Sequence, residues 1–150
     1  MTAATPAGGQ LPEAPDAWQR IMAHEADVRD ELGRLLSRLP DATGAVAATA
    51  DGLLIAHEAP DAPAEALAAL SSAGFGIGLR LAGTGGDDSF HELVVRAEHG
   101  CVALYPAGPS CVLAVLAGPH PDLQRLHTAA RATAARVADL LAAAGTDLEV

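Results

Sequence analysis

The chain has 150 residues, half of them apolar, and this size suits one domain that buries about two-thirds of its unfolded surface. Aromatic residues make up only 3% of the sequence, so Leu, Val, Ile and Ala must fill the core. The formal net charge of −10 at pH 7 argues against binding to nucleic acid or to an anionic membrane surface. All nine basic residues are Arg, and the absence of Lys excludes a phosphate-loop lysine and a Schiff-base lysine.

The N-terminal stretch, residues 1–15, is rich in Pro and Gly and carries no basic side chain. It lacks the basic and apolar regions of a signal peptide, so we expect a disordered tail there. A single domain is expected over residues 16–144, with a C-terminal tail at residues 145–150. The longest apolar run, Cys111 to Ala117, is too short to cross a bilayer. We therefore expect a cytoplasmic protein with no membrane insertion.

The first helix is expected over residues 16–39. Asp16 can cap it, and Gln19 follows three residues later, as in a capping box. Apolar residues then recur at alternating spacings of four and three, although Glu25 interrupts the stripe. Pro40 ends the helix, because the residue before a proline disfavours the helical region. A coiled coil would also fit this spacing, but three heptads are marginal, and a packed amphipathic helix is favoured.

A β-hairpin is expected over Gly44 to Glu58, where two apolar runs flank the dipeptide Asp51-Gly52. This dipeptide is a strong local hairpin signal, because both residues tolerate positive φ. The pattern predicts a two-residue primed turn, which matches the right-handed twist of paired strands.

The second helix is expected from about Ala64 to Ala82, with Asp61 placed to cap it. One apolar stripe is expected to face the sheet and contains Leu67, Leu70, Gly74, Ile77 and Leu81. A second stripe, also apolar or small, contains Ala68, Ser72, Phe75 and Leu79. A helix of this kind is usually covered on more than one face. Its glycines at positions 74, 76 and 78 indicate either close approach of another backbone or a frayed C-terminal half.

Three strand-like runs follow at residues 90–97, 101–105 and 111–117, joined by loops short enough to permit only antiparallel neighbours. The last two runs are almost continuously apolar, which indicates burial on both faces and helices on both sides of the sheet. A closing helix is expected from about Asp122 to Ala144. The element order α-β-β-α-β-β-β-α indicates an α+β fold.

Four segments match a known family in kind and order: Leu35-Leu36-Ser-Arg-Leu39, the hairpin from Gly44 to Ala56, the small-residue helix Ala66–Leu81 and the meander Leu93–Leu116. Together they resemble the roadblock/dynein light-chain superfamily, most clearly at Ala50-Asp-Gly-Leu-Leu-Ile55. The resemblance implies a profilin-like, five-stranded antiparallel sheet in the order 2-1-5-4-3. It places the second helix on one face and the first and third helices on the other.

Bacterial members of this superfamily are homodimers that bind Ras-like small GTPases and regulate their nucleotide state, and they carry no catalytic constellation. The resemblance therefore implies a non-enzymatic regulator or scaffold whose partners are a second copy of itself and a small GTPase. The absence of Lys fits a high-GC bacterial source.

In the implied sheet order the third strand is an edge, and its run of Leu93, Val94 and Val95 invites pairing with another chain. An edge protected by Glu92 and Arg96 is the alternative. We favour a two-fold dimer in which this strand pairs with its copy and the second helices meet. The expected dimer and partner interface comprises Ala68, Ser71, Ser72, Phe75, Leu79, Arg80, Phe90, Leu93 and Val95. Within it, Ser71, Phe75 and Arg80 are expected on the side that meets the GTPase.

No residue set indicates catalysis, a cofactor or a metal. If the last two strands pair as a hairpin, Tyr105 lies near Cys111 and Cys101 lies near Val115, so two buried free thiols are expected. The six histidines are scattered over five elements, and exposure to solvent is expected for them. An alternative function is a small-molecule sensor that holds its ligand between the sheet and the glycine-rich second helix.

Overall fold

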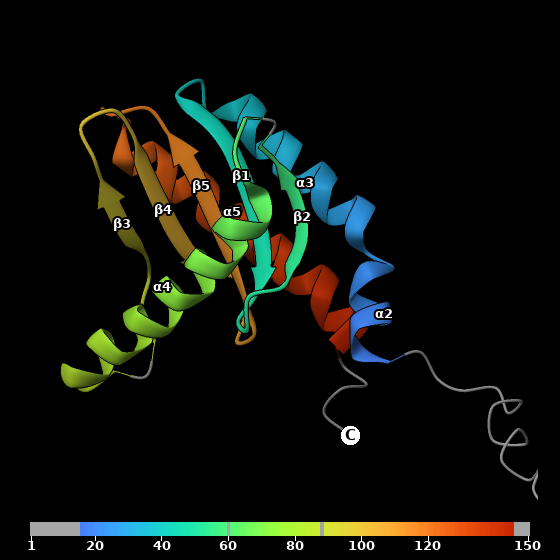
Figure 1. Cartoon of the computed structure of the whole chain (residues 1–150). Coiled ribbons are helices and arrows are strands. Elements are labelled where there is room, and N and C mark those ends of the chain that lie inside the picture. Colours follow the sequence, from blue (N-terminus) through green and yellow to red (C-terminus); the bar gives the residue numbers. More distant parts are fainter. Residues whose placement is uncertain (1–15, 60, 88, 146–150) are drawn as a thin grey trace, which may run out of the picture.

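The computed structural model describes residues 16–59, 61–87 and 89–145, and these contain a five-stranded antiparallel sheet with helices on both faces (Figure 1). The sheet order β2-β1-β5-β4-β3 confirms the expected topology. The strands are β1 (Ala42–Thr49), β2 (Leu54–Glu58), β3 (Leu93–Arg96), β4 (Cys101–Pro106) and β5 (Cys111–Ala117). The helices are α2 (Ala17–Met22), α3 (Glu25–Arg38), α4 (Ala64–Thr84) and α5 (Leu123–Gly145). Helix α4 crosses one face, and α3 and α5 cover the other, as expected (Figure 1).

The N-terminal helix is divided in two, whereas the sequence predicts one. The capping box is present: the Gln19 N–H donates to Asp16 Oδ1 at 2.8 Å, and the Asp16 N–H donates to Gln19 Oε1 at 3.1 Å. Helix α2 ends at Met22, and α3 begins after His24. The break falls just before Glu25, where a polar residue interrupts the apolar stripe. It lets α2 turn toward α5 while α3 runs along the sheet (Figure 1).

The β1–β2 turn differs from the predicted two-residue turn. The Thr49 N–H donates to the Leu53 carbonyl at 2.9 Å, so three residues connect the strands. Only Gly52 among them has positive φ, at 100°. Asp51 keeps negative φ, which its side chain prefers sterically, and its carboxylate accepts a hydrogen bond of 2.5 Å from the Thr49 hydroxyl.

The β4–β5 register also differs from the expected one by two residues. Cys101 lies opposite Ala117, and Tyr105 lies opposite Leu113. Pro106 pairs with Val112, so the connecting turn lies one residue later in the chain than expected. Both cysteines are free and buried, as expected. Strand β3 starts at Leu93, later than the expected residue 90.

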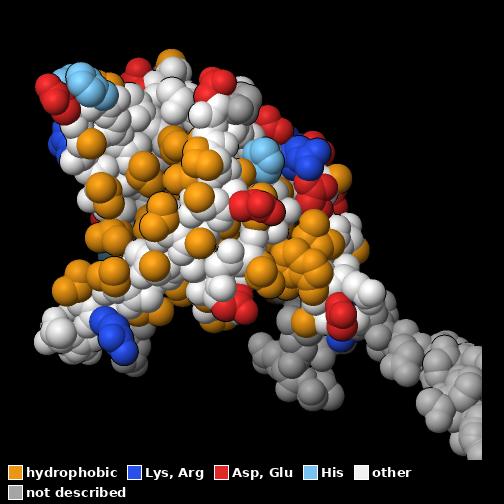
Figure 2. Space-filling model, viewed as in Figure 1, with side chains coloured by type: hydrophobic (Ala, Val, Ile, Leu, Met, Phe, Trp, Pro, Cys, Tyr) orange, Lys and Arg blue, Asp and Glu red, His pale blue; other side chains and the backbone are white. Residues whose placement is uncertain are grey.

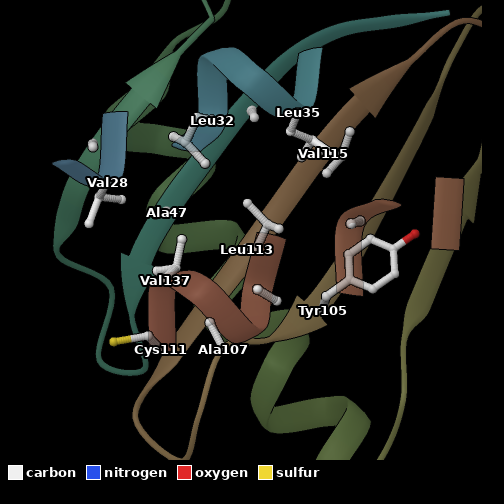
Figure 3. Close-up of a cluster of buried hydrophobic side chains, with 14 of the residues drawn as sticks. Val28, Leu32, Leu35, Ala47, Tyr105, Ala107, Cys111, Leu113, Val115 and Val137 are labelled. Atoms are coloured by element: carbon white, nitrogen blue, oxygen red, sulfur yellow. The ribbon is translucent and has the colours of Figure 1, made fainter. Parts of the chain in front are cut away.

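Strand β5 is buried on both faces, which confirms the prediction made from its continuous apolar run. On one face Leu113 and Val115 pack with α3 and α5 side chains, including Leu32, Leu35 and Val137 (Figure 3). On the other face Val112 and Ala114 pack beneath α4.

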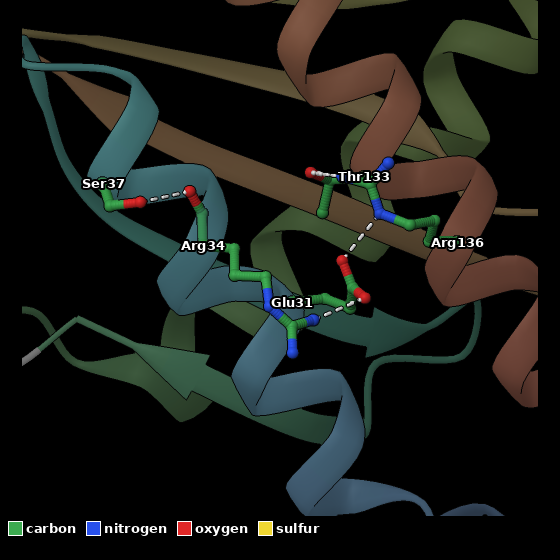
Figure 4. Close-up of polar contacts among 5 residues, drawn as sticks. All are labelled: Glu31, Arg34, Ser37, Thr133 and Arg136. Atoms are coloured by element: carbon green, nitrogen blue, oxygen red, sulfur yellow. Dashed lines mark hydrogen bonds and ion pairs between the residues drawn. The ribbon is translucent and has the colours of Figure 1, made fainter.

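Polar contacts connect the two helices that share a face. Glu31 of α3 accepts hydrogen bonds from Arg34 at 2.9 Å and from Arg136 of α5 at 2.7 Å (Figure 4). Tyr105, fully buried, brings its hydroxyl within 2.7 Å of Nδ1 of His127 on α5. Because the arginines are 40–58% exposed, we expect the ion pairs to orient the helices more than to stabilise them.

Gly74 and Gly78 of α4 fit closely against side chains beneath the helix, and the frayed C-terminal half, one of the two explanations drawn from the sequence, is wrong. The helix runs on to Thr84, so its C-terminal half is not frayed, and Pro63 rather than Asp61 occupies the cap position. A Cβ on Gly74 would lie 2.5 Å from Leu104 Cδ1, and one on Gly78 would lie 2.7 Å from the Phe90 ring. These two glycines therefore leave room for side chains beneath the helix.

We expect Gly74→Ala and Gly76→Ala to change stability in opposite directions. The replacement at Gly76 meets no atom within 4 Å, so it should raise the free energy of unfolding by up to about 1 kcal/mol through helix propensity. At Gly74 the new methyl must displace the buried Leu104, and overpacking of this kind costs about 1–3 kcal/mol. Urea unfolding at one fixed protomer concentration measures both variants. Equal effects would contradict the close fit at Gly74.

Candidate interaction surface

Helix α4 packs on the sheet mainly through residues outside the stripe predicted to face it, although Gly74 of that stripe meets Leu104 of β4. Ala68, Phe75 and Gly78 are buried against the sheet, whereas Leu70 is 67%, Ile77 54% and Leu81 60% exposed. The prediction was wrong because both stripes are apolar and the hydropathy pattern does not distinguish them. Side-chain size indicates the buried side of α4 better than hydropathy does, because that side combines the small residues Ala68, Ser71 and Gly78 with a single aromatic ring.

The nine residues expected at the interface divide between the interior and the surface. Ala68, Ser71 and Phe75 are buried, and the Phe75 ring lies 5.8 Å from the Phe90 ring, centroid to centroid. Their side chains therefore face the chain's own sheet and not a partner. Four of the others are half-buried and two are exposed: Ser72, Leu79, Phe90 and Leu93 in the first group, Arg80 and Val95 in the second.

The outward stripe of α4 continues onto the edge of the sheet. Positions 70, 77 and 81 lie on one side of a helix, and Gly74 lies between that side and the sheet, because a Cβ on it would lie 2.5 Å from Leu104 of β4 and 3.6 Å from Leu93 of β3. Val95, 55% exposed, projects from the same side of β3 as Leu93. Figure 2 shows hydrophobic side chains along α4 and over the adjoining sheet, with few charges among them. We define the α4–β3 surface as Leu70, Ile77, Leu81, Leu93 and Val95.

Strand β3 is an open edge of the sheet. The Ala97 N–H donates to the Gly100 carbonyl at 2.8 Å, which closes the β3–β4 hairpin. Because the direction of hydrogen bonding alternates along an antiparallel strand, Leu93 and Val95 also bond to β4, and the backbone groups of Val94 and Arg96 point outward. No strand of the described part of the chain pairs with that outer side. These backbone groups are therefore available to another chain.

Helix α4 is long and apolar enough to cross a membrane, judged by length and composition alone, with 28% of the tested window buried. Core helices of globular domains meet the same criterion. Here Ala68 and Phe75 pack in the cluster beneath α4, together with Val46, Leu104 and Val112. The apolar residues of α4 thus lie on two sides, one covered by the sheet and one left exposed.

The titratable side chains of the described residues offer no metal-binding cluster. No three His, Cys, Asp or Glu side chains among them are placed to hold a metal ion. The expectation of exposed histidines holds for His91, His99 and His120. It is wrong for His24, His57 and His127, which are half-buried. His127 also bonds to Tyr105.

A cavity of about 850 Å³ lies where the turns of the sheet meet the α2–α5 side of the fold. It is lined by both turns, residues 49–51 and 107–111, together with Ile21 of α2 and residues of α5. We call it the turn cavity. Burial, and secondarily the nearby Asp51 carboxylate, raises the pKa of the Cys111 thiol on its wall to about 11. The thiol is therefore protonated at neutral pH and is not an activated nucleophile.

Solved structures similar to the chain include the following three. A structure described as MglB with tetrameric arrangement is 19% identical, with a TM-score of 0.70 over 90% of this chain and 97% of that one. MglB from Myxococcus xanthus is 15% identical, with a TM-score of 0.71 over 78% and 96%. A Roadblock/LC7 domain from Streptomyces avermitilis is 26% identical, with a TM-score of 0.63 over 81% and 98%. No curated protein sequence matches the chain.

The family model described as the Roadblock/LC7 domain matches residues 29–117, which is more than half of the chain. The matched region begins in α3 and ends with β5, so it includes the whole sheet and α4. The resemblance noted in the sequence is thereby confirmed: the chain belongs to the Roadblock/LC7 family.

Proposed function

We propose that the protein is a non-enzymatic, homodimeric regulator or scaffold that binds a Ras-like small GTPase and modulates its nucleotide state. The proposal of a dimer rests on the α4–β3 surface, where exposed aliphatic side chains lie beside an open strand edge. The GTPase partner rests on the family resemblance. The proposed site of action is cytoplasmic.

A second copy of the chain suits the α4–β3 surface better than an unrelated partner. An antiparallel edge strand can pair with its own copy about a two-fold axis, which joins two sheets of five strands into one. The same axis brings the outward side of α4 beside its copy and covers Leu70, Ile77 and Leu81. A structural relative in a tetrameric arrangement is consistent with self-association in this family.

The charges at the edge favour one register. If the axis passes at Val94, the outward-facing Val94 residues form a hydrogen-bonded pair, and Glu92 of each copy lies opposite Arg96 of the other. Leu93 then faces Val95 on the α4 side. A shift of the axis to Val95 would remove the pairing of Glu92 with Arg96, because Glu92 would then face Glu98 in the β3–β4 turn. Glu92 also forms an ion pair with Arg131 in its own chain, so its carboxylate is already fixed at the edge.

The GTPase is proposed to bind the outer side of the paired α4 helices. Of the residues expected to meet it, Arg80 is exposed, whereas Ser71 and Phe75 are buried and act by supporting the helix. The net charge of −10 would steer a partner through its basic face and would do so less at high salt.

The alternative function, a small-molecule sensor, would have its ligand site at a different place from the one expected. Beneath α4, Leu104 and the Phe90 ring fill the space that Gly74 and Gly78 leave. The turn cavity, lined largely by the two turns and α5, is the specific observation that favours ligand binding.

Ile77→Glu should convert the dimer into a monomer, because two buried carboxylates would meet near the two-fold axis. Light scattering across a hundredfold concentration range should give about twice 15.1 kDa for the unmodified chain and 15.1 kDa for the variant. The control is Leu53→Glu, since Leu53 is similarly exposed at 50% but lies outside the α4–β3 surface. A monomeric unmodified chain would refute the dimer.

Val94→Cys should form a disulfide between two copies under mild oxidation, in a background that replaces Cys101 and Cys111 by Ser. In the proposed register the two Val94 Cα atoms lie about 5.5 Å apart, within the usual range for disulfides. The matched control, Val95→Cys, should remain uncrosslinked because Val95 faces Leu93 of the other copy. Crosslinking through position 95 instead would place the axis elsewhere.

Arg80→Ala should weaken GTPase binding at least about fivefold without changing the dimer mass, as expected for loss of an exposed interface arginine. Biolayer interferometry with Ras-like GTPases of the source organism, loaded with GDP or a GTP analogue, measures this effect. Arg38→Ala, on α3, is the control. The GTPase proposal fails if no such GTPase binds in either nucleotide state, whereas the dimer would still stand.

A further inference from the structure

The turn cavity is formed by segments far apart in the sequence. The turn after β1 brings Thr49, Ala50 and Asp51, the turn after β4 brings residues 107–111, and α5 closes the space with Ala138, Asp139, Leu141 and Ala142. Its volume of about 850 Å³ falls within the range of about 300–1,000 Å³ common for ligand pockets. Much of its apolar lining belongs to the cluster on the α3–α5 side, and none of its lining residues belongs to the α4–β3 surface, so dimerisation through that surface leaves it open.

The walls of the cavity combine aliphatic surface with two carboxylates. Ile21, Pro109 and Leu141 are among the apolar side chains, and Asp51 and Asp139 supply the charge. Asp51 is held by Thr49, a side chain that is only 8% exposed and donates its hydroxyl hydrogen to the carboxylate at 2.5 Å. Cys111, 6% exposed, adds a second largely buried polar group to the same wall. One carboxylate is thus fixed in position before any ligand binds.

The charge of the cavity selects its ligand. Among the residues that the structure describes, the charged side chains lining it are Asp51 and Asp139, so its charge disfavours an anionic ligand. The chain's own ends are also poorly suited: residues 1–15 carry no basic side chain, and residues 146–150 include Asp147 and Glu149. A cationic group from another molecule would complement both walls.

We propose that the turn cavity binds an aliphatic group that ends in an ammonium or guanidinium, with the cation at Asp51 and Asp139 and the aliphatic part against Ile21 and Leu141. The ligand is either a small organic cation or the Arg or Lys side chain of a protein segment. Both sources share this chemistry. The site does not depend on the proposed GTPase function, because it uses neither α4 nor β3.

Isothermal titration of the full chain with hexylguanidinium tests the proposal, with hexanol as the neutral comparison and acetyl-Leu-Arg-Leu-amide as the peptide source. We expect saturable binding of at least one cationic probe with a Kd of about 1 mM or tighter and none of hexanol. The probe that binds more tightly identifies the source, and either result supports the proposal. Failure of both cationic probes to bind, or equal binding of hexanol, would overturn it.

A double variant, Asp51→Asn with Asp139→Asn, tests the carboxylates. It should raise the Kd at least about tenfold, since the cation loses both of its charged hydrogen-bond acceptors. Asn at position 51 can still accept the Thr49 hydrogen bond, and circular dichroism checks that the turn remains folded. Asp30→Asn, an exposed position on α3, is the matched control and should leave the Kd unchanged. An unchanged Kd in the double variant would refute the site, and the dimer mass reports separately on the α4–β3 surface.

Discussion

The fold depends on a central strand that is buried on both of its faces. Strand β5 pairs with β1 on one side and β4 on the other, and Val112 to Val115 alternate between the two hydrophobic clusters. A strand with this environment needs helices above and below it, and α4 and the α3–α5 pair supply them. Because aromatic side chains are scarce, small residues such as Ala47 and Ala114 let the helices approach the sheet closely.

Much of this arrangement could be predicted from the sequence, because hydropathy and turn residues act locally. The buried run Cys111 to Ala117, the Asp16 capping box and the order of elements all followed from short-range patterns. The structure differs where two local solutions are close in energy. At the β1–β2 turn, Asp51 keeps negative φ and one more residue enters the loop, and between β4 and β5 the register shifts by two residues.

The interaction surface was harder to predict than the fold. Both long stripes of α4 are apolar, so only packing against the sheet decides which of them faces outward. That decision depends on Leu104 and Phe90, which lie in distant segments and occupy the space left by Gly74 and Gly78. The turn cavity could not be predicted for a related reason: its walls come from four elements, and no motif in the sequence connects Asp51 with Asp139.

The two edges of the sheet differ, and the difference limits how the chain can assemble. At the β2 edge the pairing slips between Ala47 and Ala48, so that Ile55 has no partner on β1, and such a bulge distorts an edge strand. Strand β3 has no comparable irregularity in its register. A molecule with one regular edge can join a single copy of itself and then has no equivalent edge left to extend. Sheet growth should therefore stop at a closed pair, and the bulge at Ile55 protects the chain against forming fibres.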